Sequence, residues 1–229
     1  MAIMKKTLRE SGVVVDNSLS QAATSLKEGE TLSYNPQSKK WEAREVQLPG
    51  GWKDCSVSFN TGKSAADSPD WKDIGNGIYA WHFDDRRSEG IHLSFHATQD
   101  YEVGTKVYPH IHWMPMSNST GSVVWKMKYT IAKGYGQGEA LTGDVDTIEI
   151  SQHANGISGE HLVVETSENQ AFQVPEAGSV VMMHVYRDGS NPNDTFVGDV
   201  VGISINLDYY SKRVSNPNKH SPNNPHNNH

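Results

Sequence analysis

The stretch Lys106-Val107-Tyr108-Pro109-His110-Ile111-His112-Trp113 decides the fold class, because its apolar residues alternate as they do in a β-strand. Val107, Ile111 and Trp113 fall on one face by a period of two, and we expect this face to be buried. Around the stretch, short apolar runs are separated by turn signals, and no long helical pattern lies between them. The region is therefore predicted to fold from antiparallel strands.

Eight or nine such strands are expected in the larger part of the chain. Clusters of Gly, Asn, Asp and Ser separate them, and residues 61–77 are expected to form a long polar connection with Trp71 as its anchor. The predicted architecture is an all-β, antiparallel β-sandwich or jelly roll over residues 51–214. The strands are placed near residues 55–60, 78–84, 89–97, 105–114, 121–133, 145–152, 161–166, 178–187 and 195–210.

The histidines form the most distinctive chemical pattern. His110 and His112 point together to the face opposite the apolar one, and His92 and His96 share a face of an earlier strand. If the two strands pair, these imidazoles meet and exchange hydrogen bonds, either across the ladder or across an interface between subunits. We therefore predict a structural role for the four histidines, with no bound metal and no cofactor.

The alternative for the same residues is a metal site. Two imidazoles at positions i and i+2 can chelate one ion, and cupins carry such a pair, normally followed a few residues later by a Glu ligand. Here no Asp or Glu follows His112 until Glu139. A third ligand would have to come from His92, His96, His82 or Asp84.

The last predicted strand suggests contacts between subunits. Val201, Ile203 and Ile205 are expected on its buried face, and Gly198 and Gly202 on the opposite face. Because glycines have no side chain, another strand or another subunit can approach closely there. We assign both glycines to oligomerisation.

The first 50 residues form a separate N-terminal region. An arm, with a short helix expected near residues 18–27, precedes a β-hairpin in which Leu32 and Tyr34 face Trp41 across an Asn-Pro turn. A lone two-stranded hairpin is marginal in water, so this one needs the main domain or a second copy of itself. Leu32, Tyr34 and Trp41 are accordingly predicted to serve attachment and oligomerisation.

The rest of the sequence limits the possible function classes. Residues 215–229 are an Asn-, Pro- and His-rich tail, expected to be disordered. The net charge of −7 argues against nucleic acid as a partner. The single cysteine, Cys55, excludes an internal disulfide, and no apolar run is long enough for a membrane span or a signal peptide. No nucleophile elbow is present, and we predict no catalytic residues and no enzyme activity.

Four segments carry a resemblance to a known class of proteins. Lys27–Trp41 resembles the hairpin of many tailed-bacteriophage tail and fibre proteins, and Tyr108–Trp113, Trp125–Tyr129 and Gly198–Arg213 are similar to segments of β-rich phage virion proteins. The resemblance covers about two-thirds of the chain. It implies a homo-oligomer, often a trimer, that is attached to a capsid, neck or tail and has no catalytic residues.

The sequence thus predicts a structural component of a tailed-phage virion, assembled in the host cytoplasm. It would form a trimeric decoration, collar or fibre-like projection, anchored through residues 1–50, with itself and other virion proteins as partners. One alternative is a cupin-like metal-binding enzyme that uses His110 and His112. The other is a surface carbohydrate-binding module, in which Trp71 or Tyr135 stacks on a host glycan.

Overall fold

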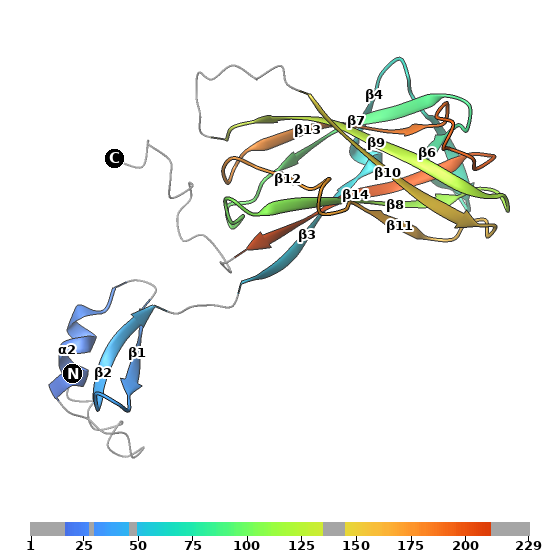
Figure 1. Cartoon of the computed structure of the whole chain (residues 1–229). Helices are drawn as coiled ribbons and strands as arrows, with labels where there is room; N and C mark the ends of the chain where they lie inside the picture. Colours follow the sequence, from blue (N-terminus) through green and yellow to red (C-terminus); the bar gives the residue numbers. More distant parts are fainter. Residues whose placement is uncertain (1–16, 28–29, 46–49, 135–144, 212–229) are drawn as a thin grey trace. The chain divides into compact units, whose positions relative to one another are not determined.

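The computed structural model describes residues 17–27, 30–45, 50–134 and 145–211 (Figure 1). The chain divides into two compact units, Met1–Pro49 and Gly50–His229. The arm before residue 17, the loop that contains Tyr135 and the tail after residue 211 lie outside the described residues, and so do the predictions made for them.

The N-terminal unit is a helix packed on a hairpin. Helix α2 (Asn17–Ser25) covers the antiparallel strands β1 (Glu30–Asn35) and β2 (Lys40–Glu45). Leu19 and Ala22 of the helix are buried, and Ser18 Oγ accepts a hydrogen bond from the Trp41 N–H at 2.8 Å. The predicted hairpin is present, and within its own unit it packs against this helix.

The larger unit is an antiparallel β-sandwich, which confirms the predicted fold class (Figure 1). The five-stranded sheet runs in the order β10 (Asp146–Asn155), β9 (Thr120–Ala132), β13 (Val180–Asp188), β7 (Ser88–His96) and β4 (Lys63–Ser64). The seven-stranded sheet runs in the order β11 (Leu162–Glu165), β8 (Lys106–Pro115), β14 (Val200–Ser211), β6 (Ile78–Phe83) and β5 (Asp70–Gly75), with β12 (Phe172–Gln173) paired to β8 and β3 (Gly51–Ser58) paired to β14.

The core lies between the inner faces of the two sheets. Val107, Ile111 and Trp113 are at most 1% exposed, as their alternation predicts. Trp125 of the five-stranded sheet is fully buried against Trp113, with ring centroids 6.5 Å apart. The strands therefore present one apolar and one polar face, and the polar face of the seven-stranded sheet is left to carry the chemistry described below.

Two strand assignments from the sequence are wrong. The connection expected at residues 61–77 contains strands β4 and β5, and β5 forms a hairpin with β6. The last strand starts at Val200 and not at 195. Beyond β3, the chain turns into the short 3-10 helix η1 (Phe59–Thr61), whose Phe59 enters the core.

Gly202 makes a close contact inside the domain. A register shift between Gly202 and Ser204 changes which residues face inward, so Ile203 is 38% exposed, contrary to its predicted burial. A Cβ atom added to Gly202 would lie 2.0 Å from Cδ2 of Phe59, so the missing side chain makes room for a core ring of the same unit. Gly198 precedes the strand with a φ of 114°, where a side chain is strained. The role of both glycines in oligomerisation stays a prediction.

A buried ion pair holds the two sheets together at one end. Arg187 of β13 and Asp194 of the following loop are both fully buried, and Arg187 Nε and Nη2 donate to the two carboxylate oxygens at 3.0 and 2.8 Å. The remaining guanidinium hydrogens reach the carbonyl oxygens of Phe83, Phe196 and Gly198 at 3.2, 2.8 and 2.7 Å. Because Phe83 ends β6, the guanidinium links the five-stranded sheet to the seven-stranded one.

We expect Arg187→Ala to lower the free energy of unfolding of the main unit by about 3–5 kcal/mol, because it leaves the Asp194 carboxylate buried without a cation. Urea denaturation followed by tryptophan fluorescence measures the loss. Arg86→Ala is the matched control, since its side chain is 85% exposed and pairs only with a neighbouring carboxylate. Equal stability of the two variants would contradict a clamping role for Arg187.

Candidate functional site

The candidate site lies on the outer face of the seven-stranded sheet. Strand β14 pairs with β3 on one side and with β8 on the other, and the register places Asp208 directly opposite both Asp54 and Tyr108. Two residues further along β14, and therefore on the same face, Tyr210 lies opposite Trp52. The residues that alternate with these on β14 are buried in the core, so the same strand supplies the core on one face and the site on the other.

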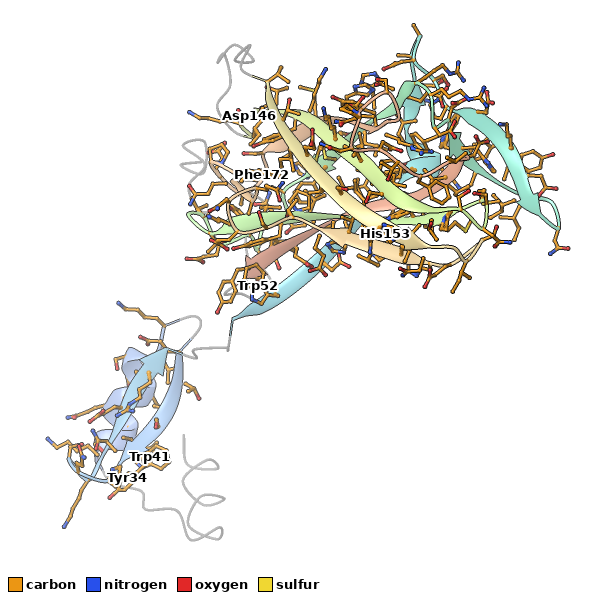
Figure 2. The ribbon with its side chains drawn as sticks, turned by 45° about the vertical axis from the view of Figure 1, so that its right-hand side comes forward. Tyr34, Trp41, Trp52, Asp146, His153 and Phe172 are labelled. Atoms are coloured by element: carbon orange, nitrogen blue, oxygen red, sulfur yellow. The ribbon has the colours of Figure 1, made fainter. Side chains whose placement is uncertain are left out.

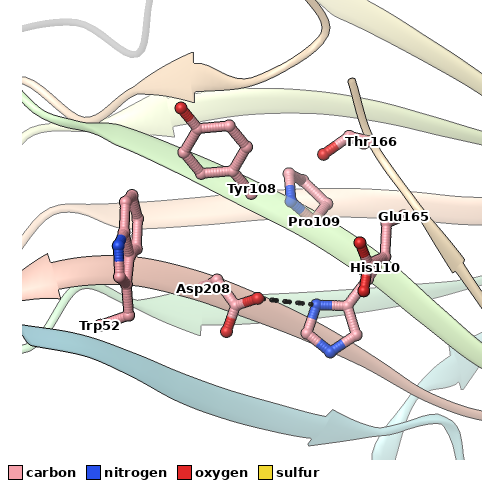
Figure 3. Close-up of a pocket in the computed structure, with 7 residues that line it drawn as sticks. All are labelled: Trp52, Tyr108, Pro109, His110, Glu165, Thr166 and Asp208. Atoms are coloured by element: carbon pink, nitrogen blue, oxygen red, sulfur yellow. Dashed lines mark ion pairs between the residues drawn. The ribbon is translucent and has the colours of Figure 1, made fainter. Parts of the chain in front are cut away.

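A cleft of about 280 Å³ opens on this face (Figure 3). Trp52 forms one wall: its indole is 59% exposed and makes edge-to-face contacts with Tyr108 at 5.4 Å and with Tyr210 at 5.6 Å. These two contacts set the orientation of the exposed ring before any ligand binds. The cleft is lined by Trp52, Tyr108, Pro109, His110, Glu165, Thr166 and Asp208.

The floor of the cleft combines an imidazole with carboxylates. His110 is 8% exposed, and its Nδ1 lies 3.5 Å from Oδ2 of Asp208, the contact drawn in Figure 3. Glu165 of β11 lies directly opposite His110 in the ladder. Burial raises the pKa of the Asp208 carboxyl, with His110 lowering it and the charges of Asp54 and Glu165 raising it further. The site is therefore acidic, and its negative charges repel each other.

His112 faces the same side as His110, as predicted, with ring centroids 5.2 Å apart. Its partner is a residue that the sequence does not single out: His112 Nδ1 lies 2.8 Å from His161 Nε2, and the two rings stack. Burial lowers the pKa of His112, and the neighbouring His110 and His161 lower it further. The surroundings of His112 therefore favour its neutral form over its protonated form.

Within the chain, His92 and His96 do not meet His110 and His112, so the predicted contact across a shared ladder is wrong. Both belong to β7 of the five-stranded sheet, whereas β8 belongs to the other sheet. His92 stacks instead on His184 of β13, which lies directly opposite it, with ring centroids 4.4 Å apart. The chain crosses from one sheet to the other between β7 and β8, a change that local alternation does not reveal.

The other candidates from the metal-site alternative also lie elsewhere. His82 of β6 is buried, its Nδ1 is 3.7 Å from an Asp199 carboxylate oxygen, and burial lowers its pKa. Asp84 follows the end of β6 and accepts a hydrogen bond from the Arg86 N–H. Cys55 on β3 is half-buried, and burial raises the pKa of its thiol, so it remains a protonated packing residue.

The residues predicted for glycan contact and attachment are partly described. Trp71 lies on β5, is 45% exposed, and stacks near Tyr79 with Trp81 edge-on to it. In the N-terminal unit, Tyr34 and Trp41 lie side by side with ring centroids 5.6 Å apart (Figure 2), and Leu32 of β1 is half-buried and lies opposite Ala43.

Sequence reasoning missed Trp52, Asp54, Glu165 and Asp208. The signal was present on the last strand, since Asp208 and Tyr210 alternate with the apolar Leu207 and Tyr209. What the sequence lacks is the order of strands that brings β3, β14, β8 and β11 together.

The comparisons with known proteins do not identify a family. Neither a protein-family model nor a curated protein matches the chain. Among the described residues, no helix has the length and apolarity needed to cross a bilayer.

Solved structures show only remote likeness, at 6 to 12% identity. An exo-β-1,3-galactanase from Phanerochaete chrysosporium with galactose is 9% identical, with 78% of this chain and 32% of the other covered and a TM-score of 0.36. The CBM22-1 xylan-binding domain of Paenibacillus barcinonensis Xyn10C is 10% identical, with 68% of this chain and 83% of the other covered and a TM-score of 0.27. A chain from the structure of infectious bursal disease virus, Gx strain, is 6% identical, with 80% of this chain and 40% of the other covered and a TM-score of 0.31. The chain spans about a third of the galactanase. At these TM-scores the likeness carries no argument about function.

The main unit should lose stability as the pH falls. Burial lowers the pKa of His82, His112 and His184, so the unfolded chain takes up these protons before the folded chain does. This stability is present above the ordinary histidine pKa of about 6.5 and declines as the pH falls from there toward the lower folded values. The measurement is the melting temperature at about pH 7.5 and about pH 5.5.

His112→Gln should show a smaller loss between the two pH values than the wild-type protein, because one of the depressed groups is removed. His153→Gln is the control, since His153 is an exposed residue of β10. A melting temperature that rises on acidification, or a pH dependence of His112→Gln equal to that of the control, would contradict this assignment.

Proposed function

We propose that the β-sandwich is a non-catalytic binding module for a neutral oligosaccharide, and that the cleft beside Trp52 is its binding site. One observation carries the proposal: an exposed indole, oriented by two tyrosines, stands beside carboxylates on a rigid sheet face. An aromatic ring offers a flat apolar surface to the C–H face of a pyranose. Carboxylate oxygens supply acceptors for sugar hydroxyl groups.

The charge of the cleft restricts the sugar class. Asp208 and Glu165 line the cleft, and Asp54 adds a third carboxylate beside Asp208. Anionic sugars such as uronic or sialic acids would be repelled by this surface, whereas neutral or amino sugars would not. The site is assembled from four paired strands, so little ordering is needed when a ligand binds.

Trp52→Ala should weaken binding about fivefold or more, because it removes a stacking surface worth on the order of 1 kcal/mol or more. A glycan microarray on the purified chain identifies the oligosaccharide, and titration calorimetry with that oligosaccharide measures the affinity. The bound oligosaccharide should be recovered intact, since the module binds without turnover.

Trp71→Ala is the matched control, because Trp71 is also an exposed tryptophan of the same sheet but lies on β5. Loss of binding in Trp71→Ala alone would move the site to the β5–β6 hairpin. No binding to any glycan on the array, or cleavage of the bound sugar, would overturn the proposal.

A second proposal concerns the whole chain: it is a homo-oligomeric, trimeric subunit of a tailed-phage virion, attached through its N-terminal unit to capsid, neck or tail proteins. The observation that favours it is the separate N-terminal unit, with its own helix-covered hairpin and the Tyr34–Trp41 pair, of which Tyr34 is 36% exposed. Such a unit can hold a partner while the β-sandwich remains free to bind.

Deletion of residues 1–49 should leave the melting temperature of the main unit unchanged and abolish incorporation into particles, because the two units have separate cores.

Light scattering on the full chain should give three times its mass of 25.3 kDa. Tyr34→Ala/Trp41→Ala is a milder variant that should reproduce the loss of incorporation. Normal incorporation of the deleted chain, or a strictly monomeric full chain, would sink this proposal.

A further inference from the structure

We propose that Asp54, His110 and Asp208 form a binding site for one divalent transition-metal ion, with Zn²⁺ as the ion to test. Each residue offers one ligand atom, and these atoms all lie within 4.8 Å of one another. The three residues come from the adjacent strands β3, β8 and β14. This ligand set shares His110 with the pair suggested by the sequence, but it replaces His112 with two carboxylates.

The hydrogen-bonded ladders hold the three residues in place. Asp54 and Asp208 are directly opposite each other on β3 and β14, and His110 is diagonal to Asp208 because it lies opposite Asn206. Facing and diagonal side chains of paired strands are within reach of one another. The ligands are therefore positioned by the sheet itself and not by a loop.

The charges around this cluster are unbalanced without a cation. Like charges directly opposite each other in a ladder are destabilising, and Glu165 adds a third carboxylate opposite His110. The titratable groups that act on Asp208 are His110, Asp54 and Glu165, and among the ion pairs of the described residues none joins the three acids to Lys or Arg. A bound divalent cation would neutralise this surplus of negative charge.

His110 supplies an independent indication of a ligand. The residue is 8% exposed, and its Nδ1 atom is buried without a hydrogen-bond partner. The nearest carboxylate oxygen, Oδ2 of Asp208, lies 3.5 Å away, which is too long for a hydrogen bond of ordinary strength. An unpartnered buried nitrogen is costly, and coordination of a metal ion would satisfy it.

The carboxylate of Asp54 is also held by neighbours. Asn206 Nδ2 donates to Asp54 Oδ2 at 2.8 Å, and Ser204 Oγ donates to Asn206 Oδ1 at 2.8 Å. Both Asn206 and Ser204 are buried. Outer groups that orient a ligand in this way raise the metal affinity of known sites.

The donor set favours a transition metal. One imidazole nitrogen with two carboxylate oxygens suits Zn²⁺, whereas Ca²⁺ and Mg²⁺ prefer oxygen ligands alone. Three protein ligands leave a coordination position for water or a ligand in the cleft. The metal site is a separate proposal, because its three ligands are in place whether or not an oligosaccharide binds in the cleft.

A second cluster on the other sheet serves as an internal comparison. Asp67, His92 and His184 also bring ligand atoms together, but the two imidazoles are stacked at 14°, so their in-plane lone pairs lie in nearly parallel planes and do not converge. Lys63 and Lys128 line a pocket together with His92 and His184, and they add positive charge there. We therefore place the metal at His110 and not at His184.

The test uses the full chain, stripped with EDTA and produced without an affinity tag. His220, His226 and His229 are changed to alanine in every sample, so that the tail cannot contribute imidazoles. Titration calorimetry with ZnCl₂ and metal analysis after dialysis should give one Zn²⁺ per chain. His110→Ala and Asp208→Asn should each weaken binding by about tenfold or more.

His92→Ala and Trp52→Ala should leave Zn²⁺ binding unchanged. Asp208→Asn also checks the fold: without metal it should melt at the same temperature as the parent or higher, because one repelling charge is gone, and ZnCl₂ should raise the melting temperature of the parent only. No bound Zn²⁺, or loss of binding in His92→Ala but not in His110→Ala, would overturn the proposal. Trp52→Ala separates the two proposals, because it should weaken oligosaccharide binding and leave Zn²⁺ binding unchanged. If the chain binds no oligosaccharide, the Zn²⁺ measurement still tests the metal site.

Discussion

The fully buried ion pair between Arg187 and Asp194 is the interaction on which the arrangement of the two sheets depends. A buried charge is tolerated only where its partners are supplied, and here the guanidinium is met by a carboxylate and by three carbonyl oxygens. One of these carbonyls ends β6, and the others belong to the loop that leads into β14. The start of β14 is therefore fixed relative to the opposite sheet.

Strand β14 in turn organises the outer face. It is the shared neighbour of β3 and β8, so the position of its residues decides which side chains of those strands meet. Asp208 alone faces an acid on one side and a tyrosine on the other. The cleft, the exposed indole and the acidic cluster all follow from this one register, although Trp52 and Asp208 are 156 positions apart in the chain.

Local patterns predict the part of this structure that depends on neighbours in sequence. The alternation of Val107, Ile111 and Trp113 correctly assigns their burial, and the shared face of His110 and His112 follows from the same period. The partners of those histidines are set by strand order, which no local pattern encodes, so His161, Asp208 and Glu165 were missed. The inward position of Ile203 was predicted wrongly because one irregular pair shifts the period.

That irregularity between Gly202 and Ser204 also constrains how the protein can change over time. Downstream of it, Asn206 and Asp208 face outward while Ile205 and Leu207 face the core. Point substitutions can alter either set alone. An insertion or deletion of one residue at the bulge would exchange the two sets, burying the Asp208 carboxylate and exposing the core residues. Single substitutions can therefore change the surface residues or the core residues of this strand separately. A change in its length would alter both sets at once, because one alternation assigns each residue to a face.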